Sequence, residues 1–346
     1  MDKNDSIQLK GIAILMMVWL HLFSEQSITE DCINFLFFKG RPLAYMLTKL
    51  CACCVSMYAV LGGYGLSAVY SKSQGEMHNG RRALLLMANF WIVCLLFIPV
   101  GCIFRPDIYP GDWAQLLLNI SAVSYSYNGA WWFLLPYVLI TLCSKHIIRL
   151  LLHSSLRKEM AIFSALLILH VAAYIAKDYC NPSPGSLKQL AVVGLNVIYL
   201  LFMFAIGVAL FKHHWIQTLR KHLEQYDKKR RNASLALALF GICLLRISIG
   251  NSALMNLPFS VLIIILFTLL EKPCACTSAA TFLGQHSTNV WLCHCFFLNM
   301  LLQGQVYALR YPLAILIAVL LLALTASYFI KRIFTPIRNM MMNVSH

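Results

Sequence analysis

The chain has 346 residues, of which 60% are hydrophobic and only 12% are charged, and its mean hydropathy is +0.71. Soluble domains hold about a quarter charged residues, and a water-soluble protein of this size could not bury so much apolar surface. The composition therefore excludes a soluble enzyme and predicts an integral membrane protein. The net charge of +15 does not indicate a nucleic-acid partner here, because basic residues collect in the cytoplasmic loops of membrane proteins.

Apolar segments of about 20 residues are long enough to cross a bilayer as helices. We expect an all-α integral membrane protein with a single transmembrane domain over 1–346, whose first apolar run is a retained helix rather than a signal peptide. The second segment contains LGGYG (61–65), and we expect the helix to break there because glycines loosen a helix. In chain order, the ten expected spans are 8–24, 43–70, 83–103, 131–152, 159–176, 191–211, 234–250, 255–270, 282–303 and 311–330.

The basic residues predict the orientation of these spans. With the N-terminus in the cytoplasm, the cytoplasmic loops and termini hold 20 of the 28 Lys and Arg residues, the opposite side holds 7, and Arg246 lies within a span. Because positive charge marks the cytoplasmic side, both termini are expected in the cytoplasm. We expect a multi-pass protein of the inner (plasma) membrane.

Two loops and the cysteines add weaker signals. The outer loop 104–130 has the composition of an ordered interfacial segment that touches a polar substrate, or of an aromatic belt at the membrane surface. The loop 212–231 is typical of a basic helix that lies on anionic lipid, so membrane lipids are expected partners. Most of the 13 cysteines lie in apolar runs as small hydrophobes. The C-x-C pairs at 274–276 and 293–295 are weak evidence for zinc, and we expect no metal site.

Three histidines are placed near the middle of expected spans. His21 lies eleven residues after Lys10, which is roughly 16 Å along a helix, and His170 and His294 reach a similar depth. All acidic residues lie in loops or at span ends, so proton handling within the membrane would fall to histidine. For His170 we favour a hydrogen bond to a neighbouring helix. For His21 and His294 the composition leaves both a structural and a catalytic role open.

The sequence resembles the acyltransferase 3 family of membrane acyltransferases along its whole length. That family has a basic residue and a histidine in its first span, matched by Lys10 and His21 in KGIAILMMVWLH, and a basic pair matched by Arg81 and Arg82. Further matches are MYAVLGGYGLSAVY, NGAWWFLLPYVLI and LGQHSTNVWLCHCFF (283–297). Two departures are lysine for arginine at position 10, which replaces a bidentate contact by a point charge, and glycine for serine at Gly62.

The resemblance implies an O-acyltransferase, most simply an O-acetyltransferase, that moves an acyl group from cytoplasmic acetyl-CoA to a hydroxyl of an extracytoplasmic glycan or small acceptor. Polysaccharide modification in the cell envelope is the corresponding role. His21 and His294 would be catalytic, and Lys10, Arg81 and Arg82 would contact the phosphates of CoA. The candidates for stabilising a developing oxyanion, besides His294, are Tyr64, Trp131 and Trp132.

Two other functions remain open from the sequence. A polytopic transporter or exporter of small polar solutes or glycan precursors is the main alternative, although buried carboxylates and an inverted repeat are missing. A sensing or tethering module without chemistry is the other. Because the chain ends soon after its last expected span, an acyltransferase would meet its acceptor directly or through a separate extracytoplasmic partner protein. The sequence predicts neither the acceptor, nor acetyl against succinyl, nor the oligomeric state.

Overall fold

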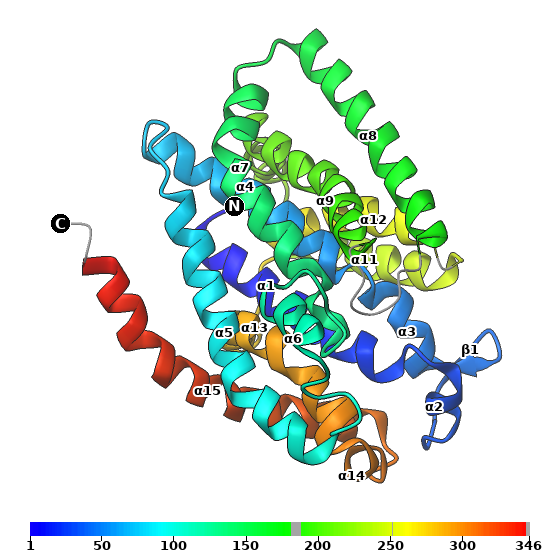
Figure 1. Cartoon of the computed structure of the whole chain (residues 1–346). Coiled ribbons are helices and arrows are strands. Elements are labelled where there is room, and N and C mark those ends of the chain that lie inside the picture. Colours follow the sequence, from blue (N-terminus) through cyan, green and yellow to red (C-terminus); the bar gives the residue numbers. More distant parts are fainter. Residues whose placement is uncertain (181–187, 251, 344–346) are drawn as a thin grey trace. The chain divides into compact units, whose positions relative to one another are not determined.

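The computed structural model describes residues 1–180, 188–250 and 252–343, and these are almost entirely helical (Figure 1). Backbone contacts divide the chain into two compact units. Unit 1 contains Met1–Met77, Ser144–Val171 and Tyr199–Ser287, and unit 2 contains His78–Cys143, Ala172–Ile198 and Thr288–His346. Four helices belong to both units: α7 (Leu134–Leu152), α8 (Leu156–Tyr179), α9 (Lys188–Lys212) and α13 (Cys274–Phe296).

Unit 1 is built on the N-terminal helices, where α1 packs against α3 and α4, and α11 packs against α12. The sheet among its described residues is an antiparallel hairpin that pairs Phe37 with Pro42 and Phe38 with Arg41. Its further elements are α1 (Lys3–Phe23), α2 (Gln26–Glu30), β1 (Phe37–Phe38), β2 (Arg41–Pro42), α3 (Leu43–Cys51), α4 (Cys54–Lys72), α10 (Trp215–Leu223), α11 (Lys228–Ser248), η2 (Ala253–Met255) and α12 (Asn256–Leu269).

Unit 2 includes the C-terminal part of α13, and its α5 packs against α15. A π-helix, η3, follows directly after α13, and π-helical turns often occur at functional sites. The elements of unit 2 are α5 (Asn79–Phe104), α6 (Trp113–Ile120), the 3₁₀-helix η1 (Gly129–Phe133), η3 (Phe297–Leu301), α14 (Gln303–Tyr307) and α15 (Pro312–Asn343).

Among the described residues, eight helical segments are long and apolar enough to cross a membrane. They correspond to eight of the ten expected spans. The other two expected spans coincide with the shorter apolar segment Ala253–Leu269 and with α13 together with η3. The protein is therefore an all-α, multi-pass membrane protein, whereas the count of ten spans and the cytoplasmic termini stay predictions.

The expected break at 61–65 is wrong. The helix runs without interruption from Cys54 to Lys72, and the chain instead turns at Ala52 and Cys53, between α3 and α4. Gly63 serves close packing, because a Cβ added there would lie 2.0 Å from the backbone oxygen of Phe204 in α9. The glycines in this segment thus allow two helices of unit 1 to approach, rather than loosening one of them.

A capping box fixes where α1 begins. The Asp5 backbone N–H donates to the Asp2 side chain at 2.7 Å, and the Asp2 backbone N–H donates to the Asp5 side chain at 3.0 Å. This arrangement satisfies N–H groups that have no partner within the helix. From that start, α1 continues to Phe23 without a break, so the positions of Lys10 and His21 along it follow from helical geometry.

Candidate functional site

His294 is fully buried near the end of α13 in unit 2. Its Nδ1 lies 2.9 Å from the backbone oxygen of Val290 and 3.0 Å from that of Trp291. Carbonyl oxygens only accept hydrogen bonds, so Nδ1 must carry the proton and donate to them. In the neutral ring the lone pair is then on Nε2, and this is the nitrogen that can take up a proton.

The thiol of Cys295 lies beside that nitrogen. Its Sγ is 3.3 Å from Nε2 of His294, and the side chain is buried. The main chain of Ala130 also lies within hydrogen-bonding reach of the sulfur. A thiol that is hydrogen-bonded to an imidazole is the arrangement of an activated nucleophile. From the sequence this cysteine was considered only as part of a C-x-C pair, which is weak evidence for zinc; the adjacency of Cys and His in CHC (293–295) was the signal that could have indicated a thiol beside an imidazole.

The 3₁₀-helix η1 holds this part of α13 in place. Trp131 donates its ring N–H to the backbone oxygen of Leu292 at 2.9 Å, and Asn128 donates to the same oxygen at 3.1 Å. In return, Trp291 donates its ring N–H to the backbone oxygen of Ala130 at 2.9 Å. Trp131 was a candidate for stabilising an oxyanion. Its ring N–H instead donates to a backbone carbonyl of α13 and positions the turn that precedes His294.

Aromatic rings surround the end of α13. Phe296 stacks on Phe97 with ring centroids 4.5 Å apart, and the Trp131 ring lies edge-on to Phe296 and to Phe90. Such packing excludes water and strengthens any electrostatic interaction inside. The other candidate tryptophan, Trp132, is half-buried, and its ring lies 4.8 Å below the ammonium of Lys177.

In unit 1, the predicted pair Lys10 and His21 lies on α1, and both residues are half-buried. Eleven residues turn a helix through about 1,100°, which is about 20° more than three full turns. The two side chains therefore leave α1 on the same face, one above the other. Close packing holds this helix: Gly11 and Gly284 leave room for no Cβ between α1 and the N-terminal part of α13.

Tyr64, the third predicted residue in unit 1, lies on α4 and is buried. Its hydroxyl accepts hydrogen bonds from the amino group of Met1 at 3.1 Å and from Gln217 of α10 at 3.4 Å. These contacts tie the chain start, α4 and α10 together. They give the hydroxyl a structural function in unit 1 in addition to any role toward a substrate.

Arg81 and Arg82 lie in the first turn of α5 in unit 2 and are half-buried. Arg81 donates to the backbone oxygen of Met341 in α15 at 2.6 Å. Its Nε and one Nη of Arg82 are buried without a hydrogen-bond partner among the described residues. Buried guanidinium donors without partners are costly, and phosphate oxygens would satisfy them.

His170 and Arg246 are the other polar residues that the sequence placed within spans. His170 is buried in unit 1, its Nδ1 lies 2.8 Å from the backbone oxygen of Tyr199, and its ring stacks on that tyrosine. This agrees with the structural role expected for it. Arg246 is also fully buried and donates to the side chain of Asn256 at 2.7 Å, joining α11 to α12.

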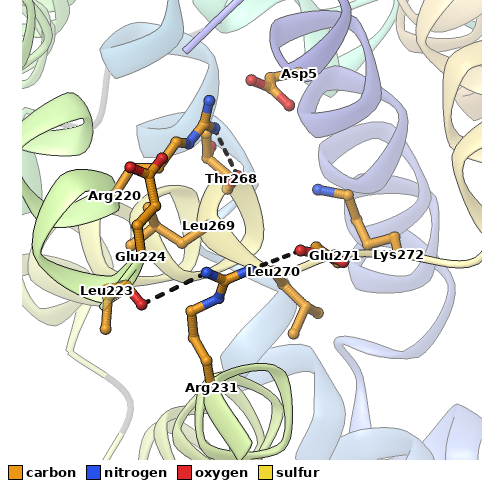
Figure 2. Close-up of a pocket in the computed structure, with 10 residues that line it drawn as sticks. All are labelled: Asp5, Arg220, Leu223, Glu224, Arg231, Thr268, Leu269, Leu270, Glu271 and Lys272. Carbon is orange, nitrogen blue, oxygen red and sulfur yellow. Dashed lines mark hydrogen bonds and ion pairs between the residues drawn. The ribbon is translucent and has the colours of Figure 1, made fainter. Parts of the chain in front are cut away.

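A cavity of about 340 Å³ lies in unit 1 between the ends of α10, α11 and α12 (Figure 2). Hydrogen bonds from Lys228 and then from Arg231 hold the pKa of Glu271 below its ordinary value. Because three carboxylates balance three cations, the cavity offers no net positive charge to a polyanion, and Lys10 does not line it. The charged lining residues are Asp5, Glu224, Glu271, Arg220, Arg231 and Lys272.

The structure thus groups the predicted residues by unit. Unit 1 holds the set Lys10, His21 and Tyr64, and unit 2 holds the remaining predicted residues. Within unit 2, Trp131 is brought to the helix turn of His294, because it donates to the carbonyl two positions before it. The other predicted site residues in unit 2 are Arg81, Arg82 and Trp132.

Comparison with known protein families gives one match. A family model described as an acyltransferase domain matches residues 4–332, which is nearly the whole chain and includes parts of both units. In the same comparisons, no curated protein and no solved structure matches the chain.

Proposed function

We propose, from the premise that the chain belongs to the acyltransferase 3 family, that it transfers an acyl group, most simply acetyl, from cytoplasmic acyl-CoA to a hydroxyl of an extracytoplasmic glycan or related acceptor. The product is an oxygen ester. The protein would act in the inner membrane as a cell-envelope O-acyltransferase.

The observation that carries this proposal is the position of His294 Nδ1 beside two carbonyl oxygens, from which we infer the tautomer of the ring. With Nδ1–H held by two carbonyl oxygens, the ring presents a basic Nε2 in a buried, aromatic-lined site. Acyl transfer to a hydroxyl needs a base that removes the hydroxyl proton as the oxygen attacks, and a histidine near neutral pH suits that role. His21 remains a second candidate for proton transfer, on the face of α1 that also carries Lys10.

Three cations are assigned to the donor. CoA carries several phosphate charges, and Lys10, Arg81 and Arg82 would contact them. Arg81 Nε and one Nη of Arg82 are buried and have no hydrogen-bond partner in the part of the chain that the structure describes. This supports the assignment, because a bound phosphate would supply acceptors for them. The thioester group of the donor supplies the acyl group, and the residues of the chain bind, orient and deprotonate.

The test compares two histidine variants that change the same atoms. An asparagine at position 294 keeps an N–H donor near the place of Nδ1 and removes Nε2, so His294→Asn should lower kcat by about 10²–10⁴-fold. His170 also uses Nδ1 for a backbone carbonyl, so His170→Asn is the matched control and should keep its activity. The readout is acyl-group mass on envelope glycans from cells that express each variant.

Equal loss in both variants, or full activity of His294→Asn, would contradict the proposed role of His294.

A thermal-shift measurement separates the acyltransferase from a transporter. A ligand that binds only the native state raises its melting temperature, so acetyl-CoA should stabilise the detergent-purified protein in a concentration-dependent manner. Free acetate at the same concentration is the control and should leave the melting temperature unchanged.

A further inference from the structure

We propose that Cys295 is an acyl-accepting nucleophile, so that the acyl group rests on this thiol between donor and acceptor. The proposal rests on the proposed acyltransferase function and adds a covalent step to it. Its basis is geometric: Sγ of Cys295 lies 3.3 Å from Nε2 of His294, and Nε2 is the nitrogen left without a proton by the two carbonyls on Nδ1.

The hydrogen bonds fix the direction of proton transfer. Since Nδ1–H is already donated, the Cys295 S–H is the donor toward Nε2, and moving its proton to the ring gives a thiolate, which is the reactive form of cysteine. Burial disfavours the negative charge on this sulfur, and the main chain of Ala130, which lies within hydrogen-bonding reach of it, offsets part of that cost. The burial of both side chains keeps water from hydrolysing a thioester there.

A second cysteine two positions earlier shows what a structural thiol looks like in the same helix. Cys293 is also buried, and its Sγ lies 3.9 Å from the backbone oxygen of Val290 and 3.8 Å from that of Ala323. Carbonyl oxygens accept its weak S–H but offer no base that could remove the proton. The pair Cys293 and Cys295 therefore differs in the one feature that nucleophilic catalysis needs.

The covalent steps balance in atoms and electrons. In the first, the Cys295 sulfur attacks the thioester carbon, the bond from that carbon to the CoA sulfur breaks, and the thiol proton passes through Nε2 of His294 to the CoA thiolate. In the second, the acceptor hydroxyl attacks the Cys295 thioester, its proton goes to Nε2, and the thiol of Cys295 is restored. The first step exchanges one thioester for another, so little free energy is lost before the ester forms.

The experiment traps the intermediate on the full-length protein in detergent. Wild-type protein is mixed with acetyl-CoA that carries a radioactive acetyl group, without acceptor, and is then denatured in acid. We expect label on the peptide that contains Cys295, released by neutral hydroxylamine, together with an equal amount of free CoA. Cys295→Ala should lose the label, and Cys293→Ala should keep it.

Steady-state kinetics give a second readout that does not depend on a variant. A thiol intermediate predicts ping-pong kinetics, with parallel double-reciprocal plots when donor and acceptor are varied. The proposal is overturned if Cys295→Ala transfers acyl groups at the wild-type rate, or if the wild type transfers them without labelling this peptide. In both cases acyl transfer itself persists. A wild type that neither releases CoA nor modifies an acceptor contradicts the proposed function and the thiol step together.

Discussion

Position 10 carries a lysine, where the family resemblance of the sequence leads us to expect an arginine. An ammonium is a single point charge, whereas a guanidinium binds a phosphate through two parallel N–H groups. Lys10 is half-buried on α1, so its charge is only partly screened by water. In the proposed contact with an anionic donor, lysine would keep the attraction and would lack the bidentate geometry of a guanidinium.

We therefore predict that Lys10→Ala raises KM for acetyl-CoA about tenfold, the loss of one charge-assisted contact, with little change in kcat. Lys10→Arg should lower KM or leave it unchanged. Lys3→Ala, on the exposed first turn of the same helix, is the control. Initial rates at varied acetyl-CoA measure both constants, and a wild-type KM for Lys10→Ala would refute the phosphate contact.

His21 shares a helix face with Lys10, and we predict that His21→Ala abolishes acyl transfer. Replacing a general base or acid by a methyl group typically costs about 10²–10⁴-fold in rate. Because His21 is only half-buried, the variant should insert and fold. Protein yield and melting temperature in detergent, measured beside the transfer rate, distinguish loss of chemistry from loss of structure. Normal acylation by this variant would remove His21 from the mechanism.

At this scale the sequence predicts residue types better than it predicts partners. It places His294 correctly within an apolar helix. A histidine there is costly unless it has a function or a hydrogen bond, which is why the residue was singled out. It does not predict the proton on Nδ1, which depends on the carbonyls of Val290 and Trp291. Nor does it predict that the Trp131 N–H is donated to Leu292, since tertiary folding alone brings those residues together.

At the scale of elements, paired glycines decide how α4 packs against α9. An added Cβ at Gly63 would lie 2.0 Å from the backbone oxygen of Phe204, and one at Gly207 would lie 2.0 Å from that of Val60. These neighbours are helix backbone, so only a shift of a whole helix can relieve the contact. The crossing is therefore set by the absence of side chains at two positions.

We predict opposite effects for two alanine substitutions in α4. Gly63→Ala should destabilise unit 1 by about 3 kcal/mol, the upper end of the usual cost of overpacking. At Gly65 nothing lies within 4 Å of the added Cβ, so Gly65→Ala should be neutral or stabilising by up to about 1 kcal/mol from helix propensity. Tryptophan fluorescence during heating in detergent measures both, and equal melting temperatures would contradict the packing.

The position of the helix break illustrates what an element-level prediction lacks. A glycine-rich stretch within an apolar run has two physical meanings, a flexible point or a site of close approach, and periodicity does not separate them. The partner helix α9 is distant in the sequence, so the packing at Gly63 leaves no local trace. The turn at Ala52 and Cys53 contains neither glycine nor proline, so no local pattern indicates a turn there.

At the scale of the molecule, the distribution of charge predicts which side of the membrane each loop faces. Cys180 and Cys274 are exposed, free thiols. The charge asymmetry places Cys180 in an outer loop and Cys274 in a cytoplasmic one. An impermeant maleimide should therefore label Cys180 in intact cells, and Cys274 only after the membrane is opened. Labelling of Cys274 in intact cells would contradict this orientation and indicate the opposite one.

Composition alone establishes the class of this protein, because apolar content on this scale is stable only in lipid. The number of spans is less secure, since α13 carries polar residues along an otherwise apolar helix. Asn289, for example, accepts a hydrogen bond from Asn89 in α5 at 2.6 Å. Hydropathy counts such residues against a span, although a partner inside unit 2 satisfies them. A helix whose polar residues are paired inside the protein is thus harder to recognise as a membrane segment.

The hydrogen bonds that hold the proton on Nδ1 of His294 also have a consequence for proton conduction through the ring. A histidine conducts protons only if it receives one on the first nitrogen and releases one from the second, and here the second nitrogen is closed by two backbone oxygens. A proton that enters at Nε2 must return from Nε2. In the proposed acyl transfer, the ring would therefore exchange protons with its substrates without itself carrying protons from one side of a membrane to the other.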